Sequence, residues 1–130
     1  MRILIVDDSS ATRTFLREAL ETRDGVGGDV EVTEADGGLE ALRVLPRGPY
    51  SLVISDINMG GVNGLELLYF IRSNKSYEGM AVLLISTQSA ERDRDRGMQL
   101  GADGFLAKPF TQEQLRTAVA KVLAKRSGNG

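Results

Sequence analysis

The sequence predicts an α/β domain in which a parallel sheet is covered by helices on both faces. Short apolar runs rich in β-branched residues alternate with amphipathic helical segments along the whole chain. Most of these runs are apolar without alternation, which is typical of parallel strands buried on both faces. Five strand–helix units in succession predict right-handed crossovers and a doubly wound, three-layer sandwich with five strands and five helices.

Five segments have strand character, and they are residues 3–6, 30–35, 52–55, 82–86 and 104–107. Four of them are apolar throughout, so we expect helices to cover both of their faces. The segment VEVTEA at 30–35 alternates instead, which predicts a strand at an edge of the sheet.

Amphipathic helices are expected between the strands and after the last one. The helix within residues 9–24 is predicted to bury Ala11, Phe15, Ala19 and Leu20. The last helix, within 115–126, is predicted to bury Leu115, Ala118, Val119, Val122 and Leu123. Thr111 and Gln114 have the spacing of a capping box at its start.

The segment SAERDRDRGMQLG at 89–101 is an unusual helix, because residues 91–96 are all charged. Only Ala90, Met98 and Leu100 are expected to anchor it. Two interpretations stay open: a solvated helix face with alternating charges, or a loosely held helix suited to rearrangement.

Length and composition exclude several function classes. The 130 residues predict one domain, over 1–126, with a short tail at 127–130. The absence of cysteine excludes a disulfide framework, a thiolate zinc site and a cysteine nucleophile. The net charge is −2 with basic residues spread along the chain, so we expect no direct binding of nucleic acid. No apolar run is long enough for a signal peptide or a membrane span, which favours a soluble, cytoplasmic protein.

Polar side chains follow the strands at the points where the strands end. The ligand site of such a sheet lies beyond the carboxyl ends of the strands, where the strand order reverses. The residues expected to converge there are Asp7, Asp8, Asp56, Ser86, Thr87 and Lys108. Asp36 ends the second strand, whose edge position is expected to leave this residue outside the cluster.

Each of these residues has an ordinary structural interpretation when it is taken alone. Asp7 and Asp8 favour the positive end of a helix, and a strand-end hydroxyl usually bonds backbone. The combination is harder to explain, because two carboxylates ~4 Å apart repel by ~4 kcal/mol at an effective dielectric of ~20. Lys108 cannot balance three negative charges, whereas Mg²⁺ prefers such oxygen ligands. A metal beside a carboxylate, a hydroxyl and an ammonium indicates phosphoryl transfer, with Asp56 as the acceptor.

Four motifs carry a family resemblance: ILIVDDS at 3–9, LVISDINM at 52–59, LLIST at 83–87 and GADGFLAKPF at 101–110. Together they resemble the receiver domain of two-component response regulators, from Met1 to about residue 125. The resemblance implies a flavodoxin-like sheet in the order 2-1-3-4-5. It also implies a phosphorylation-activated signalling switch, and an enzyme only in catalysing its own phosphorylation and dephosphorylation.

The resemblance assigns roles to individual residues. A partner sensor histidine kinase or phosphotransfer protein would phosphorylate Asp56. This phosphohistidine must lie on another molecule, since the chain has no histidine. Mg²⁺ would be bound by Asp8, Asp56 and the backbone carbonyl of Asn58, with Asp7 acting through water.

The remaining family positions concern the switch. Ser86 would hydrogen-bond the phosphoryl group and Lys108 would pair with it. Phe105 stands at the position of an aromatic switch residue, and Lys108–Pro109 at that of a cis peptide. The output is expected to be a downstream protein target or an effector domain outside this sequence.

The chain departs from the family pattern at residue 60, where glycine replaces the usual proline and leaves the loop less fixed.

Two alternatives to the signalling switch remain. A haloacid-dehalogenase-like aspartyl-phosphate phosphatase would need a second acid two residues after its nucleophile, where this chain has Asn58. A pseudo-receiver that works without phosphate is disfavoured by the intact acidic set.

Overall fold

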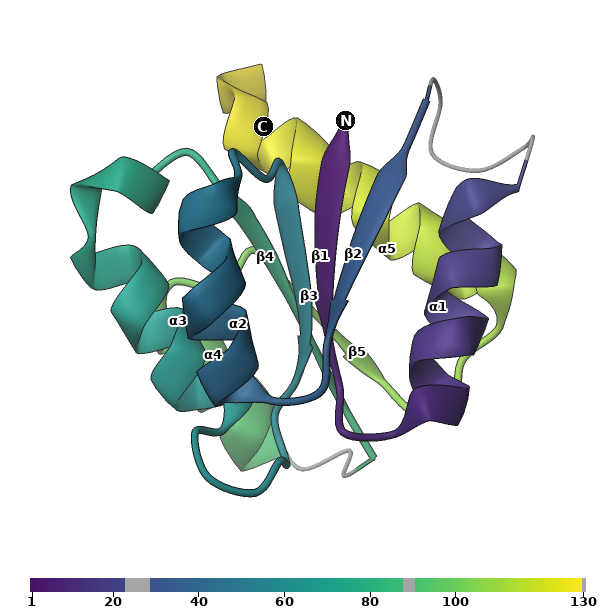
Figure 1. The fold of residues 1–130 in the computed structure, drawn as a ribbon, viewed down its shortest axis with the longest axis horizontal. Coiled ribbons are helices and arrows are strands. Elements are labelled where there is room, and N and C mark those ends of the chain that lie inside the picture. Colours follow the sequence, from purple (N-terminus) through teal and green to yellow (C-terminus); the bar gives the residue numbers. More distant parts are fainter. Residues whose placement is uncertain (23–28, 88–90, 130) are drawn as a thin grey trace.

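The computed structural model describes residues 1–22, 29–87 and 91–129. Within these residues the chain forms one parallel sheet with strand order β2-β1-β3-β4-β5, as predicted (Figure 1). The strands are β1 (Arg2–Val6), β2 (Glu31–Ala35), β3 (Leu52–Asp56), β4 (Ala81–Ser86) and β5 (Gly104–Ala107). Each agrees with its predicted range to within one residue, because the apolar runs and their polar flanks fix where a buried strand ends.

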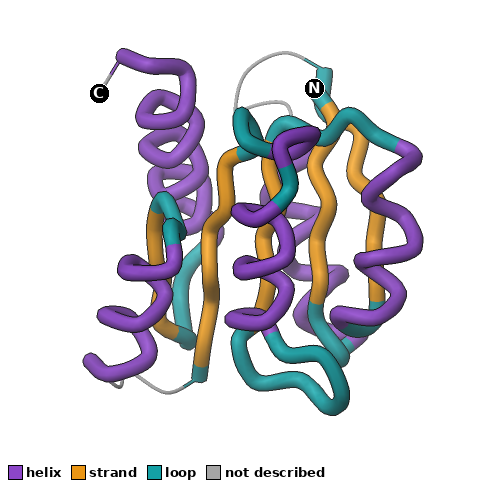
Figure 2. Tube along the Cα trace, turned by 90° about the vertical axis from the view of Figure 1, so that its left-hand side faces the viewer, coloured by secondary structure: helices purple, strands orange, loops and turns teal. Residues whose placement is uncertain are grey.

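Helices cover both faces of the sheet (Figures 1 and 2). They are α1 (Ser10–Glu21), α2 (Gly38–Val44), α3 (Gly64–Ser73), α4 (Glu91–Leu100) and α5 (Gln112–Ala124). α1 and α5 lie on one face, whereas α2, α3 and α4 lie on the other. None of these helices, in the part of the chain that the structure describes, is long and apolar enough to cross a membrane.

The core has two layers, one on each face of the sheet. Alternate residues of a strand enter opposite layers, so Leu4 packs toward α2, α3 and α4 while Ile3 and Ile5 pack toward α1 and α5. β1, β3 and β4 are buried almost throughout, as predicted. The expectation of full coverage is wrong for β5, whose four residues are only half-buried because this strand forms an edge of the sheet.

The buried face of α1 differs from the prediction. Leu16, Ala19 and Leu20 are buried, whereas Ala11 is exposed. Phe15 is half-buried, and its ring packs edge-on against that of Phe110 at 5.8 Å between centroids. α1 therefore turns a different side chain, Leu16, into the core than periodicity alone indicated.

The first turns of α1 and α5 are capped by side chains. The hydroxyl of Ser9 accepts a hydrogen bond of 3.2 Å from the backbone N–H of Thr12. The predicted capping box of α5 is confirmed, with reciprocal bonds of 2.9 and 3.0 Å between Thr111 and Gln114. These caps fix the starts of the two helices that follow β1 and β5.

α4 contacts the sheet mainly through a glycine. Gly97 is the buried residue of this helix, and a Cβ there would lie 2.6 Å from Cδ1 of Leu84 on β4. Met98, expected to be an anchor, is 40% exposed, and Leu100 is half-buried. Ala90, the third expected anchor, lies outside the described residues. The backbone of α4 thus approaches β4 closely without inserting a large apolar side chain.

Candidate functional site

Three aspartates meet at the carboxyl ends of β1 and β3. Asp7 and Asp8 follow β1, and Asp56 is the last residue of the neighbouring strand β3. One carboxylate oxygen from each lies within 4.8 Å of the others. Asp7 and Asp56 are buried, whereas Asp8 is exposed. Asp36, at the end of the edge strand β2, is not part of this group, as expected.

Asp7 is held by hydrogen bonds on all of its oxygen atoms. Its Oδ1 accepts a bond of 2.8 Å from the backbone N–H of Ser9, and its Oδ2 accepts one of 3.0 Å from Nζ of Lys108. Its backbone carbonyl accepts a bond of 2.6 Å from Nη1 of Arg13. The guanidinium of Arg13 also donates to Oε1 of Glu34 at 2.9 Å. The position of the Asp7 carboxylate is therefore fixed from α1 and from the end of β5.

Lys108 reaches two of the three carboxylates. Its Nζ lies 3.0 Å from Oδ2 of Asp7 and 3.6 Å from Oδ2 of Asp56. Its backbone N–H donates to the carbonyl of Ser86 at 2.7 Å, which ties the end of β5 to the end of β4. The peptide bond from Lys108 to Pro109 is cis. One ammonium thus offsets only part of the negative charge of the cluster.

The pKa of Asp56 is raised above its ordinary value. Burial of the carboxylate is the largest cause, and the charges of Asp7 and Asp8 add to it. Lys108 opposes the shift, as does the bond of 3.3 Å that Oδ1 of Asp56 accepts from the backbone N–H of Asn58. A buried carboxylate that is incompletely neutralised favours the approach of a further cation.

The loop between β3 and α3 passes over Asp56. The side-chain amide of Asn58 donates a hydrogen bond of 3.3 Å to Oγ of Ser86, which ends β4. A Cβ at Gly64 would collide with the backbone carbonyl of Asp56, so only glycine allows the start of α3 to lie this close to β3. The loop therefore brings Asn58 beside Asp56 and into contact with Ser86.

The donor set suits a small, hard divalent cation. Mg²⁺ takes carboxylate and carbonyl oxygens together with water and substrate oxygens, and the three clustered aspartates offer such ligands. No cysteine or histidine is available to favour a softer metal. The residues present therefore fit Mg²⁺.

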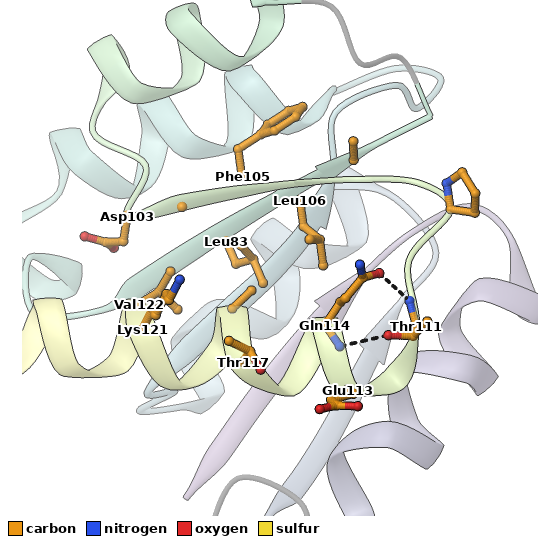
Figure 3. A pocket seen from close by; sticks show the side chains of 14 residues that line it. Leu83, Asp103, Phe105, Leu106, Thr111, Glu113, Gln114, Thr117, Lys121 and Val122 are labelled. Atoms are coloured by element: carbon orange, nitrogen blue, oxygen red, sulfur yellow. Dashed lines mark hydrogen bonds between the residues drawn. The ribbon is translucent and has the colours of Figure 1, made fainter.

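The structure also shows where the candidate hydroxyl and aromatic residues of the site and switch lie. Ser86 is buried and contacts the site, whereas Thr87 is exposed, which distinguishes the two hydroxyls that the sequence left open at this strand end. Phe105 is half-buried and packs against the core layer under α2, α3 and α4. Leu106 points to the other side, toward α5 (Figure 3). Phe105 is therefore set apart from the acidic cluster, on the strand that leads to Lys108.

A groove of about 740 Å³ runs between β5 and α5 (Figure 3). Apolar side chains such as Leu106 and Val122 line it together with Thr117 and Lys121. It follows the open edge of β5, so it is separate from the acidic cluster at the strand ends.

Arg13 is the main contributor to the site that sequence reasoning missed. Its guanidinium bridges the carbonyl of Asp7 and the carboxylate of Glu34. The available signal was an arginine one turn into the first helix, opposite an acidic residue on the edge strand. This signal is weak, because surface helices commonly carry arginine.

The family and its relatives agree with this geometry. The family model described as the response regulator receiver domain matches residues 3–120. A chemotaxis protein CheY homolog of Campylobacter jejuni is 35% identical over 131 residues, covering 100% of this chain and 98% of the relative. The chemotaxis protein CheY-3 of Vibrio cholerae is 34% identical, covering 96% of this chain and 93% of the relative.

Solved structures show the same likeness. The chemotaxis protein CheY4 of Vibrio cholerae has a TM-score of 0.83 and 30% identity, over 93% of this chain and 97% of that one. A CheY-like response regulator receiver domain protein from Methanospirillum hungatei has a TM-score of 0.83 and 26% identity, over 99% of this chain and 98% of that one. The phosphatase and pseudo-receiver alternatives are not favoured by these matches. The chain belongs to the response regulator receiver domain family, whose members are phosphorylation-activated signalling switches and not metabolic enzymes.

Proposed function

We propose that Asp56 accepts a phosphoryl group from a phosphohistidine of a sensor histidine kinase or phosphotransfer protein, in a reaction that depends on Mg²⁺. The observation that carries this proposal is the clustering of Asp7, Asp8 and Asp56 within 4.8 Å, with Lys108 reaching two of them. A receiver domain over residues 1–126 would contain every group that this reaction needs.

The transfer exchanges one bond to phosphorus for another. A carboxylate oxygen of Asp56 forms the new bond while the phosphorus–nitrogen bond of the donor breaks. The imidazole leaves with the electron pair of that bond and takes up a proton from solvent. Attack of water on phosphorus later releases inorganic phosphate and restores the carboxylate. The protein thereby catalyses only its own phosphorylation and dephosphorylation.

The metal would be held by residues that the structure brings together. Asp8 and Asp56 would supply carboxylate oxygens and Asn58 its backbone carbonyl. Asp7 would act through water, which agrees with the hydrogen bonds that already occupy its oxygen atoms. When bound, Mg²⁺ neutralises charge on the phosphoryl oxygens and so lets a dianion approach the carboxylates.

Ser86, Lys108 and Phe105 would convert phosphorylation into an altered surface. The hydroxyl of Ser86 and the ammonium of Lys108 would bond the phosphoryl oxygens. Ser86 pairs with Ala107 in the sheet register, and Leu84 pairs with Phe105. A shift of Ser86 or Lys108 would therefore displace β5 and Phe105, and a downstream protein partner would recognise the change.

Intact-mass measurement after incubation with Mg²⁺ and acetyl phosphate tests this function. We expect the mass of one phosphoryl group on the wild type, and none with excess chelator or in Asp56→Ala. Asp36→Ala is the matched control, because Asp36 also ends a strand but lies outside the cluster. Phosphorylation of Asp56→Ala would refute the assignment, and steady hydrolysis of p-nitrophenyl phosphate would favour the phosphatase instead.

A further inference from the structure

The loop between β3 and α3 is joined to the rest of the domain by few hydrogen bonds, although Met59 and Val62 pack against the core. In the described part of the chain, no hydrogen bond involves residues 59–62. Gly61 adopts a φ of +72°, and a Cβ at Gly60 would meet no atom within 4 Å. This loop also lacks the proline that the family usually has at residue 60. Glycine at residues 60 and 61 therefore restricts the backbone of this loop less than proline would.

Asn58 makes two hydrogen bonds that connect the start of this loop to the site, in addition to the backbone bonds that join Ile57 to Ile85 and Gly64. Its backbone N–H donates to Oδ1 of Asp56, and its side-chain amide donates to Oγ of Ser86, both at 3.3 Å. The second bond crosses from the loop after β3 to the end of β4, and Ser86 is itself buried. The buried side chain of Met59 adds an apolar anchor but fixes no direction for the carbonyl of Asn58.

We propose that the side chain of Asn58 is a positioning residue that orders the metal-binding loop by bonding Ser86, and so replaces the constraint that proline supplies in relatives. The inference rests on the proposed function, in which the backbone carbonyl of Asn58 is a ligand of Mg²⁺. The amide holds Asn58 from its side chain, so its carbonyl is oriented before the cation arrives. Ser86 then has a second role, as the fixed point to which the loop is bound.

Calorimetric titration with Mg²⁺ tests the role of the hydrogen bond between Asn58 and Ser86 without any phosphorylation. Replacing Asn58 by alanine keeps the carbonyl but removes the amide, so we expect Mg²⁺ affinity to fall about 2- to 10-fold, the equivalent of one net hydrogen bond. Ser86→Ala removes the other partner and should weaken Mg²⁺ binding by a similar factor. The double variant should be no weaker than either single variant, because both substitutions break the same bond.

A second substitution that restores Mg²⁺ affinity to Asn58→Ala distinguishes a positioning role of Asn58 from a general loss of structure. Gly60→Pro should restore Mg²⁺ affinity to Asn58→Ala, because Gly60 has open space around it and its N–H makes no hydrogen bond with any residue that the structure describes. Gly60→Ala is the milder version, should the proline variant fail to fold. Gln99→Ala is the control, since it removes an exposed amide on α4 that has no partner among the described residues. In the absence of metal, Asn58→Ala should melt only slightly below the wild type, as the loss of one net hydrogen bond requires, and a large drop would indicate a general loss of structure and count against the positioning role.

The outcomes distinguish this inference from the function on which it rests. If the wild type binds Mg²⁺ and Asp56 takes up phosphate, but Asn58→Ala binds Mg²⁺ as tightly, the positioning role is wrong and the function stands. Additive losses in the double variant, or no rescue by either substitution at residue 60, would also overturn it. If the wild type binds no Mg²⁺, the proposed function itself fails.

Discussion

Nζ of Lys108 donates a hydrogen bond of 3.0 Å to Oδ2 of Asp7, joining residues 101 positions apart in the sequence. The side chain of Asp7 is fully buried, and that of Lys108 is 17% exposed. The longer distance of 3.6 Å to Asp56 shows that the ammonium pairs first with the carboxylate that is not the proposed acceptor. Asp56 is thus left as the less neutralised of the two buried acids.

Removal of the Lys108 ammonium should destabilise the metal-free protein. Lys108→Ala leaves two buried carboxylates without a cation, so we expect the free energy of unfolding to fall by about 3 kcal/mol near neutral pH. Mg²⁺ should recover part of this loss, because it neutralises the same charges. Urea unfolding with and without Mg²⁺ measures both effects. The exposed Lys121→Ala should change stability by less than about 0.5 kcal/mol.

Lys108→Ala should also separate phosphorylation from output. We expect phosphorylation of Asp56 to stay measurable, while the phosphorylated variant no longer gains affinity for its protein partner. Equal affinity of phosphorylated wild type and variant would show that Lys108 does not transmit the signal.

The raised pKa of Asp56 predicts a pH-dependent instability. Because the folded pKa lies above the unfolded value of ~3.9, the native state binds more protons in that interval. This contribution to stability is fully present below the unfolded pKa and is lost as pH rises through the folded pKa. In metal-free buffer at pH ~7.5, Asp56→Asn should therefore raise the free energy of unfolding by about 1–2 kcal/mol.

Denaturant unfolding at pH ~5 and ~7.5 checks this, and the gain should shrink at the lower pH. Asp95→Asn is the control, since Asp95 is exposed on α4 and forms no ion pair with another described residue. Mg²⁺ should stabilise the wild type more than Asp56→Asn. A metal-free Asp56→Asn that is less stable than wild type at the higher pH would contradict the picture of a strained acidic site.

Gly97→Ala tests how α4 packs against the sheet. The added Cβ would lie 2.6 Å from Leu84, so the helix must move or Leu84 must repack. We expect a net loss of about 1 kcal/mol, since overpacking exceeds the gain in helix propensity. Gly79→Ala should be nearly neutral, because a Cβ there meets nothing within 4 Å. Thermal unfolding compares the two variants, and a stabilised Gly97→Ala would show that α4 is not packed through residue 97.

Phosphorylation should alter amide hydrogen exchange in β5 around Phe105 and in α4, but not in α1. α4 is joined to the sheet mainly through Gly97, and its six charged residues form no ion pair with another described residue. α1, in contrast, buries Leu16 and Leu20 and has a capped start. Exchange measured with and without phosphorylation distinguishes a local switch from a uniform change across the sheet, which would count against it.

The sequence predicts most of the fold and the cluster of aspartates, because both depend on patterns that are local in the sequence. A buried strand needs an unbroken apolar run, and a parallel sheet brings the residues after each strand to one edge. Asp7, Asp56 and Lys108 therefore meet although they are distant in sequence.

What the sequence did not predict depends on tertiary packing. Phe15 leaves the core face of α1 because it packs on Phe110, and Gly97 is buried because α4 approaches Leu84. The buried carboxylate of Asp103 is another example, since it accepts hydrogen bonds from Arg72 at 2.8 Å and from Arg126 at 3.2 Å. No pattern near any of these residues specifies its partner.

The two edges of the sheet bear on how the protein behaves at high concentration. An open strand edge is a template for pairing with another chain, and such pairing leads to aggregation. β5 offers only four residues for such pairing. β2 carries Glu31 and Glu34, which form ion pairs with arginines of the same chain, Glu31 with Arg2 and Glu34 with Arg13 and Arg17. Charged side chains along an edge strand oppose its pairing with another chain. The sheet thus ends, on one side, in a strand too short to extend and, on the other, in one bordered by ion pairs.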